Sequence, residues 1–156
     1  MSRRDIFLNI DIRQIDSGEE SIVIRYREAT GQIKKILEII NGDAKKLTGR
    51  KDDRRVVIDP EDILYIESVD DKTFAYTDKD VLRMDASLQG MLAELDDICF
   101  FRCSKSMIIN VDKVKVLKSL SSNRIDATLE NGEHVIISRT YASDFRKFLK
   151  GGYMRG

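Results

Sequence analysis

The sequence predicts a mainly β protein with a few short helices, an α+β fold built from small antiparallel sheets. Apolar and polar residues alternate through many short segments, which is the pattern of half-buried strands. Asp, Asn and Gly, the residues that favour turns, separate these segments. Only a few stretches show the spacing of an amphipathic helix. The chain has 156 residues, which suits one domain of ordinary size or a small domain with an appendage.

Residues 1–43 predict a small ββα unit. Apolar residues alternate with polar ones over residues 6–13 and 22–26, as in two strands. Thr30 can cap a helix that Gly42 would end. A unit of this size buries little core alone, so we expect it to pack on the rest of the chain or on a second copy. The apolar stripe of the helix consists of Ile33, Ile36, Leu37 and Ile40.

Residues 44–156 predict short strands and two helices. Pro60, the only proline, lies between two strands, where its missing N–H disturbs no sheet ladder. Ser87 begins one amphipathic helix and Ser138 begins another. Asn131 and Gly132 join two alternating strands, and both tolerate positive φ, so we expect a tight hairpin there. The other predicted strands cover residues 54–59, 63–69, 73–77, 81–84, 101–103, 107–110 and 114–117.

The charge is balanced overall but unevenly distributed. A formal net charge of zero argues against a nucleic-acid partner, because phosphate binders are usually basic. Residues 51–98, however, carry 6 Lys or Arg against 14 Asp or Glu, whereas residues 99–150 carry 10 against 5. The distribution is compatible with a basic face on a neutral protein, and equally with ordinary solvated charges.

Several classes of protein are excluded by what the sequence lacks. No apolar run approaches the roughly 20 residues of a membrane helix, and Asp5, Asn9 and Asp11 interrupt any signal peptide. We therefore expect a cytoplasmic protein without membrane insertion. Cys99 and Cys103 have no second pair or nearby histidine to complete a zinc site, so buried free thiols are expected rather than a redox pair.

The chemistry of an enzyme is also missing. The single histidine, His134, adjoins Glu133 in a hairpin strand, but no activated nucleophile, glycine-rich phosphate loop or metal-ligand spacing accompanies it. Acidic pairs such as Asp70 and Asp71 fall in predicted turns, where aspartate serves the backbone. We expect no enzymatic activity, no cofactor and no small-molecule substrate.

Three segments, taken together, resemble the LytTR family of bacterial DNA-binding domains. They read IDPEDILYIES from Ile58, FFRCSKSMIINVDKV from Phe100 and ENGEHVIISRTYASDFRKFL from Glu130. The second is similar to the family's most diagnostic stretch, a Phe-x-Arg strand, a His-Lys-Ser turn or a variant of it, and an apolar strand that ends in Asn. The order and spacing of the three are more specific than any one, and the resemblance begins at Lys46.

The resemblance implies a transcription regulator whose loops enter successive major grooves of double-stranded DNA. By correspondence, Lys105 lies in one contacting loop, Arg139 and Thr140 lie in a second, and the turn that contains Lys72 matches a third. Ser104 stands where the family often has histidine, and Thr140 stands where it often has a second basic residue, so fewer charges are available for phosphate. The implied DNA-binding set is completed by Arg102, Ser104, Ser106 and Ser138.

Local alternatives stay open for two of these residues. Arg102 is as well suited to an internal ion pair as to DNA, and Asn110 is better suited to capping the turn after its strand than to reading a base. Lys105 and Arg139 are long cationic donors flanked by small polar residues, a composition that suits approach to a groove. Ser138 would also place a helix N-terminus beside the DNA backbone.

Two broader alternatives concern the function of the whole chain. A LytTR-like scaffold that no longer binds DNA would be a protein-interaction module, in keeping with the zero net charge. The region before the resemblance, about 45 residues, is too short for a phosphorylated receiver domain, so we expect a stand-alone regulator. We expect residues 1–43 to mediate homodimerisation or to dock a regulatory protein partner, so that two copies read paired half-sites.

Overall fold

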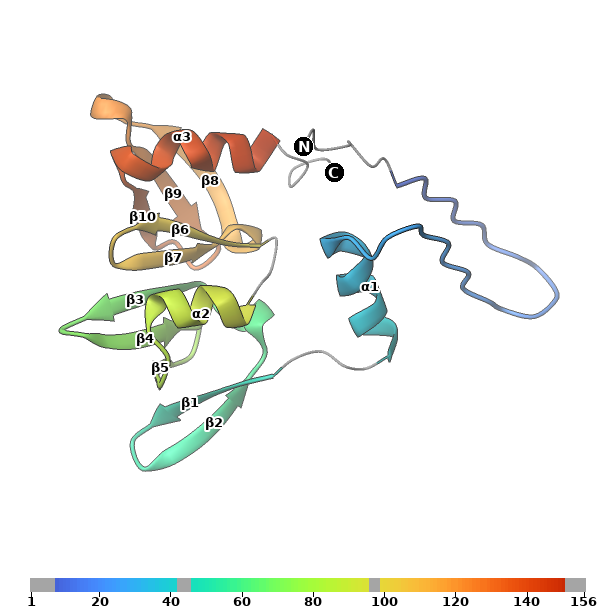
Figure 1. Cartoon of the computed structure of the whole chain (residues 1–156), viewed down its shortest axis with the longest axis horizontal. Coiled ribbons are helices and arrows are strands. Elements are labelled where there is room, and N and C mark those ends of the chain that lie inside the picture. Colours follow the sequence, from blue (N-terminus) through green and yellow to red (C-terminus); the bar gives the residue numbers. More distant parts are fainter. Residues whose placement is uncertain (1–7, 42–45, 96–98, 151–156) are drawn as a thin grey trace.

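The structure, a computed structural model, describes residues 8–41, 46–95 and 99–150. Within these ranges it contains two antiparallel sheets and three α-helices (Figure 1). Residues 46–150 fold around the two sheets, and the segment that precedes them lies to one side, joined through the first helix. The predicted mainly β fold with short helices is confirmed.

The larger sheet has seven strands in the order β2-β1-β5-β4-β3-β7-β6. Its pairs are all antiparallel, and tight hairpins join β1 to β2, β3 to β4 and β6 to β7. The strands are β1 (Leu47–Lys51), β2 (Arg54–Ile58), β3 (Tyr65–Val69), β4 (Lys72–Tyr76), β5 (Val81–Met84), β6 (Phe100–Ser104) and β7 (Met107–Asn110).

The smaller sheet has three strands in the order β10-β9-β8, namely β8 (Val114–Ser119), β9 (Ile125–Leu129) and β10 (His134–Ile137). The helices are α1 (Gly31–Asn41), α2 (Leu88–Leu95) and α3 (Arg139–Phe148), with short 3-10 turns at Pro60–Asp62, Val111–Lys113 and Ser121–Asn123.

The two faces of the larger sheet bury two separate cores. Ile66, Ala75 and Leu82 are register partners on adjacent strands and face the core beneath α2. Leu64 and Ile109 belong to the other core, which the smaller sheet and α3 complete. Because successive side chains of a strand alternate between faces, the strands at the centre can supply both cores. α3 is therefore fixed against β6 and β10.

Strand β1 was not predicted from the sequence. Its segment, LTGRK, is polar and contains Gly49, a residue that weakens strand propensity. The pairing with β2 and β5 supplies the reason for the glycine, since a Cβ there would lie 2.8 Å from Cβ of Leu82. The close approach of two strands, which local propensity does not encode, therefore decides this element.

The predicted strands at 6–13 and 22–26 are wrong over the residues that the structure describes. Residues 8–13 run outward to a bend near Gly18, and residues 22–26 return from it (Figure 1). Both segments are extended, but neither forms a strand. Among the described residues, no backbone hydrogen bond joins the outgoing and returning segments. Alternating sequence gives an extended chain, whereas a strand also needs a hydrogen-bonded neighbour. The predicted helix is α1, while Gly42 lies outside the described residues.

The hairpin at Asn131 and Gly132 forms, with a different turn from the one expected. Only Gly132 has positive φ, at 88°. Its N–H donates to the carbonyl of Leu129 at 2.9 Å, and the Leu129 N–H donates to the carbonyl of Glu133 at 2.8 Å. The loop therefore has three residues, a type I turn closed by a left-handed glycine, which is the next commonest hairpin after the two-residue type.

Candidate nucleic-acid interface

Three loops that are distant in the sequence lie together at one end of the larger sheet. Ser106 lies in the β6–β7 turn, and Ser68 lies just before the β3–β4 turn. The carbonyl of Ser106 accepts a hydrogen bond from the Ser68 N–H at 2.8 Å. The Ser138 N–H donates to the carbonyl of Cys103 at 2.8 Å, which joins the start of α3 to the end of β6. All three loops lie on the left of Figure 1.

The β6–β7 turn is held from within by Arg102. Its Nε donates to the carbonyl of Ser104 at 3.2 Å, and its Nη2 donates to the carbonyl of Lys105. The Ser106 N–H donates to Oγ of Ser104 at 3.2 Å. Arg102 is half-buried, whereas Lys105 is exposed at the tip. These bonds support the alternative that Arg102 makes an internal contact. Its partners are main-chain carbonyls and not the carboxylate of an ion pair.

The junction between β10 and α3 presents Arg139 and Thr140 in the first turn of the helix, both exposed. Ser138 occupies the N-cap position with extended φ and ψ of −68° and 157°, but its side chain makes no capping hydrogen bond. Its carbonyl accepts from the N–H groups of Tyr141 and Ala142 at 3.0 and 2.9 Å. The hydroxyl of Ser138 is therefore not committed to the helix.

The β3–β4 turn fixes the position of Lys72. Val69 and Lys72 are register partners, so Asp70 and Asp71 alone form the two-residue tip. Both aspartates have positive φ, 50° and 61°, as a type I′ hairpin requires. Lys72 is exposed at the first position of β4. Two carboxylates consequently stand beside this cation, and they oppose the approach of phosphate.

Three arginines that the sequence analysis did not single out extend this end of the sheet. Arg50 is the register partner of Arg55 on β2 and of Arg83 on β5, so the three side chains share one exposed face. Arg50 forms an ion pair with Asp85 at 2.8 Å. A shallow pocket of about 240 Å³ joins Arg50 and Arg83 to Lys72. We call Arg50, Arg55 and Arg83 the arginine row. Each points outward from its own strand, but only the pairing of β1 with β2 and β5 brings the three together.

Two stacked tyrosines lie on the same outer face, where it meets the smaller sheet. The ring centroids of Tyr65 and Tyr76 are 4.3 Å apart, and the hydroxyl of Tyr76 donates to Glu67 at 3.1 Å. Burial, and then the carboxylate of Glu133, raise the pKa of Tyr65. Burial and Glu67 raise the pKa of Tyr76 as well. Both phenols therefore stay neutral and add no negative charge beside the arginine row.

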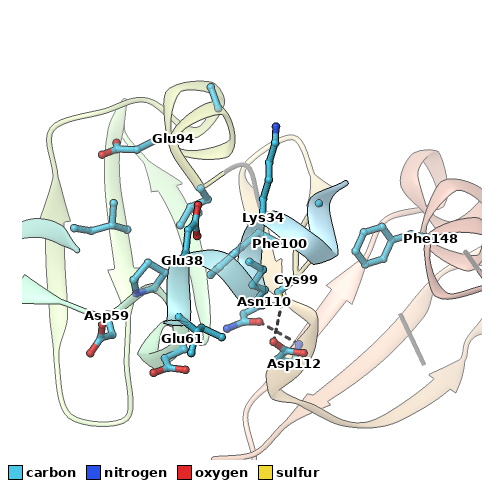
Figure 2. A pocket seen from close by; sticks show the side chains of 17 residues that line it. Lys34, Glu38, Asp59, Glu61, Glu94, Cys99, Phe100, Asn110, Asp112 and Phe148 are labelled. Atoms are coloured by element: carbon cyan, nitrogen blue, oxygen red, sulfur yellow. Dashed lines mark hydrogen bonds between the residues drawn. The ribbon is translucent and has the colours of Figure 1, made fainter. Parts of the chain in front are cut away.

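A larger pocket of about 830 Å³ lies on the other side of the molecule, between α1 and the sheets (Figure 2). Cys99 links the two sides of this pocket, because its thiol donates to Asp112 at 2.7 Å and accepts from Nζ of Lys35 at 3.0 Å. Ile33 of α1 is buried. These contacts attach α1 to the domain.

The predicted free cysteines and the cap at Asn110 are confirmed. Cys99 and Cys103 are both buried and unbridged. Asn110 is buried; its Oδ1 accepts from the Asp112 N–H at 3.1 Å, and its Nδ2 donates to the carbonyl of Ile63 at 2.8 Å. The parts of the chain that the structure describes contain no cluster of three metal-ligating side chains. They also contain no helix with the length and apolar character needed to span a bilayer.

A small β-rich domain that presents exposed cations on neighbouring loops has the features of a nucleic-acid-binding module. Residues 53–150 match the family described as the LytTr DNA-binding domain. The chain belongs to this family. The resemblance read from the three sequence segments is thereby confirmed.

Solved and curated relatives agree with this assignment. A LytTr DNA-binding domain of a response regulator from Bacillus cereus superimposes with a TM-score of 0.64 at 30% identity, covering 67% of this chain and 95% of that one. "Sensory transduction protein LytT" of Enterococcus faecalis is 29% identical over 99 residues, 63% of this chain and 40% of its own length. "Transcriptional regulatory protein YpdB" of Escherichia coli K12 is 28% identical over 100 residues, 64% and 41% respectively. The chain thus spans about two fifths of these curated relatives.

Proposed function

We propose that this protein is a sequence-specific regulator of transcription that inserts the loops bearing Lys105 and Arg139 into successive major grooves of double-stranded DNA. The observation that carries the proposal is the backbone bond from the Ser138 N–H to the Cys103 carbonyl, because it ties the two loops to one rigid framework. A fixed spacing between two reading elements is what recognition of two consecutive grooves requires.

The side chains of the two loops suit different parts of this task. Lys105 and Arg139 are exposed cations that can reach base edges, and arginine in particular matches the two acceptors of guanine. Ser106, Ser138 and Thr140 are short donors that suit phosphate oxygens. The arginine row would add sequence-independent contacts along the DNA backbone. Lys72 would add a further one against the repulsion of Asp70 and Asp71.

The names of the relatives support the regulatory half of the proposal. One is called a transcriptional regulatory protein and another a sensory transduction protein, and regulation of transcription is proposed here for this chain by analogy with them. A cytoplasmic location follows from the same proposal, since the target is DNA. The proposal leaves the base sequence of that target to experiment.

Selection of bound sequences from random duplexes, followed by affinity measurements over a range of salt, tests the proposal. We expect log Kd to change with log salt concentration at a slope of about 0.9 per phosphate neutralised. Lys105→Glu and Arg139→Glu should each weaken binding to the selected site by about 10-fold to 100-fold, the range of one lost specific contact. Lys34→Glu on α1 makes the same charge change on the other side of the molecule and should bind like the parent.

One specific feature favours the alternative of a protein-interaction module without DNA binding. Asp70 and Asp71 occupy the tip beside Lys72, and the chain as a whole has no net charge. If no duplex is enriched, or if both loop reversals bind as the parent does, the DNA-binding proposal is wrong and this alternative takes its place.

A further inference from the structure

The segment before α1 exposes an unusual amount of apolar surface. We call residues 8–15 and 19–28 the N-terminal arms; they run out from the domain and back (Figure 1). Ile10, Ile12 and Ile22 are 77%, 88% and 79% exposed. Single exposed apolar residues are ordinary, but a contiguous set on one short segment marks a surface that is covered by another molecule.

The sequence of the arms allows them to pair as an amphipathic hairpin. Gly18 has a φ of 102° at the bend, the conformation that closes a three-residue loop. If Asp16, Ser17 and Gly18 form that loop, Ile12 lies opposite Ile22. The same register sets Ile10 opposite Ile24 and Leu8 opposite Tyr26, all on one face. The other face then carries Asn9, Asp11, Arg13, Ser21, Val23 and Arg25.

Helix α1 holds the arms to the domain. Its Ile33 is buried and its Lys35 bonds to Cys99, so one side of the helix is attached. Ile39 lies one turn after Lys35 on the same side of the helix and lines the pocket between α1 and the sheets, although it is 67% exposed. The helix therefore fixes where the arms emerge from the domain.

We propose that the N-terminal arms form the interface of a symmetric homodimer. In it, the paired arms of one copy stack their apolar face on those of the second copy, as two small sheets do. The apolar face of the arms offers on the order of 700 Å² per copy, close to the roughly 800 Å² per partner of a stable interface. Pairing of the arms in the dimer also satisfies backbone groups that have no partner strand in the single chain.

Charge and position both fit a second copy as the occupant. The arms carry three arginines and four carboxylates, a mixed set, and Arg13 already pairs with Asp11 at 3.1 Å on the polar face. Two identical arms can therefore approach without a large like-charge penalty. In Figure 1 the arms lie on the side of the domain opposite to the β3–β4 and β6–β7 turns. Dimerisation there leaves the candidate DNA-contacting loops of both copies exposed.

Sedimentation equilibrium of the full chain between about 1 and 100 μM tests the interface. We expect the parent protein to sediment at twice the mass of one chain. Ile12→Asp, which places a charge in the stacked face of both copies, should weaken self-association by about 100-fold or more and yield monomers. Asn9→Asp introduces the same side chain on the other face of the same arm and should leave the dimer intact.

Each other outcome overturns the proposal. A parent protein that stays monomeric at 100 μM has no such interface, and the exposed arms then belong to a different partner. A dimer that survives Ile12→Asp with unchanged affinity is formed elsewhere on the chain. Circular dichroism verifies that each variant keeps its fold, which we expect because Ile12 contributes nothing to either core. DNA binding is measured separately: a dimer that binds no duplex refutes the proposed function and leaves this inference standing.

Discussion

Arg102 offers a sharp test of how the β6–β7 turn is built, because a residue that holds this turn and a residue that contacts DNA should respond differently to substitution. Its guanidinium donates to the carbonyls of Ser104 and Lys105. A hydrogen bond from a charged donor contributes about 1.5–3 kcal/mol when it is buried. Because the outer bond is exposed, we take about 1 kcal/mol for each, or about 2 kcal/mol together, which corresponds to about a 30-fold change in the population of the ordered turn.

Arg102→Ala should therefore weaken binding to the selected duplex by about 30-fold while the dependence of affinity on salt stays unchanged, since no phosphate contact is lost. Arg102→Lys keeps the charge but cannot bridge two carbonyls, because the ammonium lacks the planar fork of the guanidinium. It should lose nearly as much affinity. Lys105→Ala is the contrasting variant, and it should reduce the salt slope by about 0.9 if Lys105 neutralises a phosphate.

Equilibrium binding at four or more salt concentrations, with amide hydrogen exchange of the free protein, measures both effects. In Arg102→Ala, the amide of Ser106 at the turn should exchange about 30-fold faster, in proportion to the opened population. The reasoning is refuted if Arg102→Lys restores full affinity, or if Arg102→Ala lowers the salt slope without any change in exchange. Either result would make Arg102 a direct phosphate ligand.

Three further predictions concern stability. Asn110→Leu removes both side-chain hydrogen bonds and leaves the Ile63 carbonyl and the Asp112 N–H unpaired near the core. The free energy of unfolding, measured in urea, should therefore fall by about 2–4 kcal/mol. A loss below about 0.5 kcal/mol would show that the cap is dispensable. Gly49→Ala forces a Cβ to within 2.8 Å of Leu82 and should cost about 1–3 kcal/mol by the same measurement, unless β1 moves as a whole, which a crystal structure would reveal. Burial raises the pKa of the Cys103 thiol from 9.0 to about 12. The thiol of the unfolded chain therefore ionises first, and the free energy of unfolding should decline as pH rises between these two values. Cys103→Ser should flatten that decline, and an unchanged pH profile would show that Cys103 does not cause it.

Part of the fold follows from local rules. The alternating segments and their turn residues determined most strands of both sheets, and the 3.6-residue apolar spacing determined all three helices. The family segments around Lys105 and Arg139 also identified which loops to inspect. These features depend on neighbouring residues, so a single sequence contains them.

Other features depended on partners that are remote in the chain. Strand β1 has little propensity of its own and exists because β2 and β5 flank it, whereas the N-terminal arms have the right pattern and form no strand because no neighbour is hydrogen-bonded to them. The arginine row has the same origin, since only register brings Arg50, Arg55 and Arg83 to one face.

The sequence by itself thus determined the class of fold, the family and the cationic loops, because periodicity, turn chemistry and motif order are local properties. The tertiary structure alone decided that the loops at Lys105 and Arg139 lie side by side, that Arg102 supports its own turn, and that the arms are left exposed. Each of these depends on a hydrogen bond, or the lack of one, that forms only once the chain has folded around its two cores.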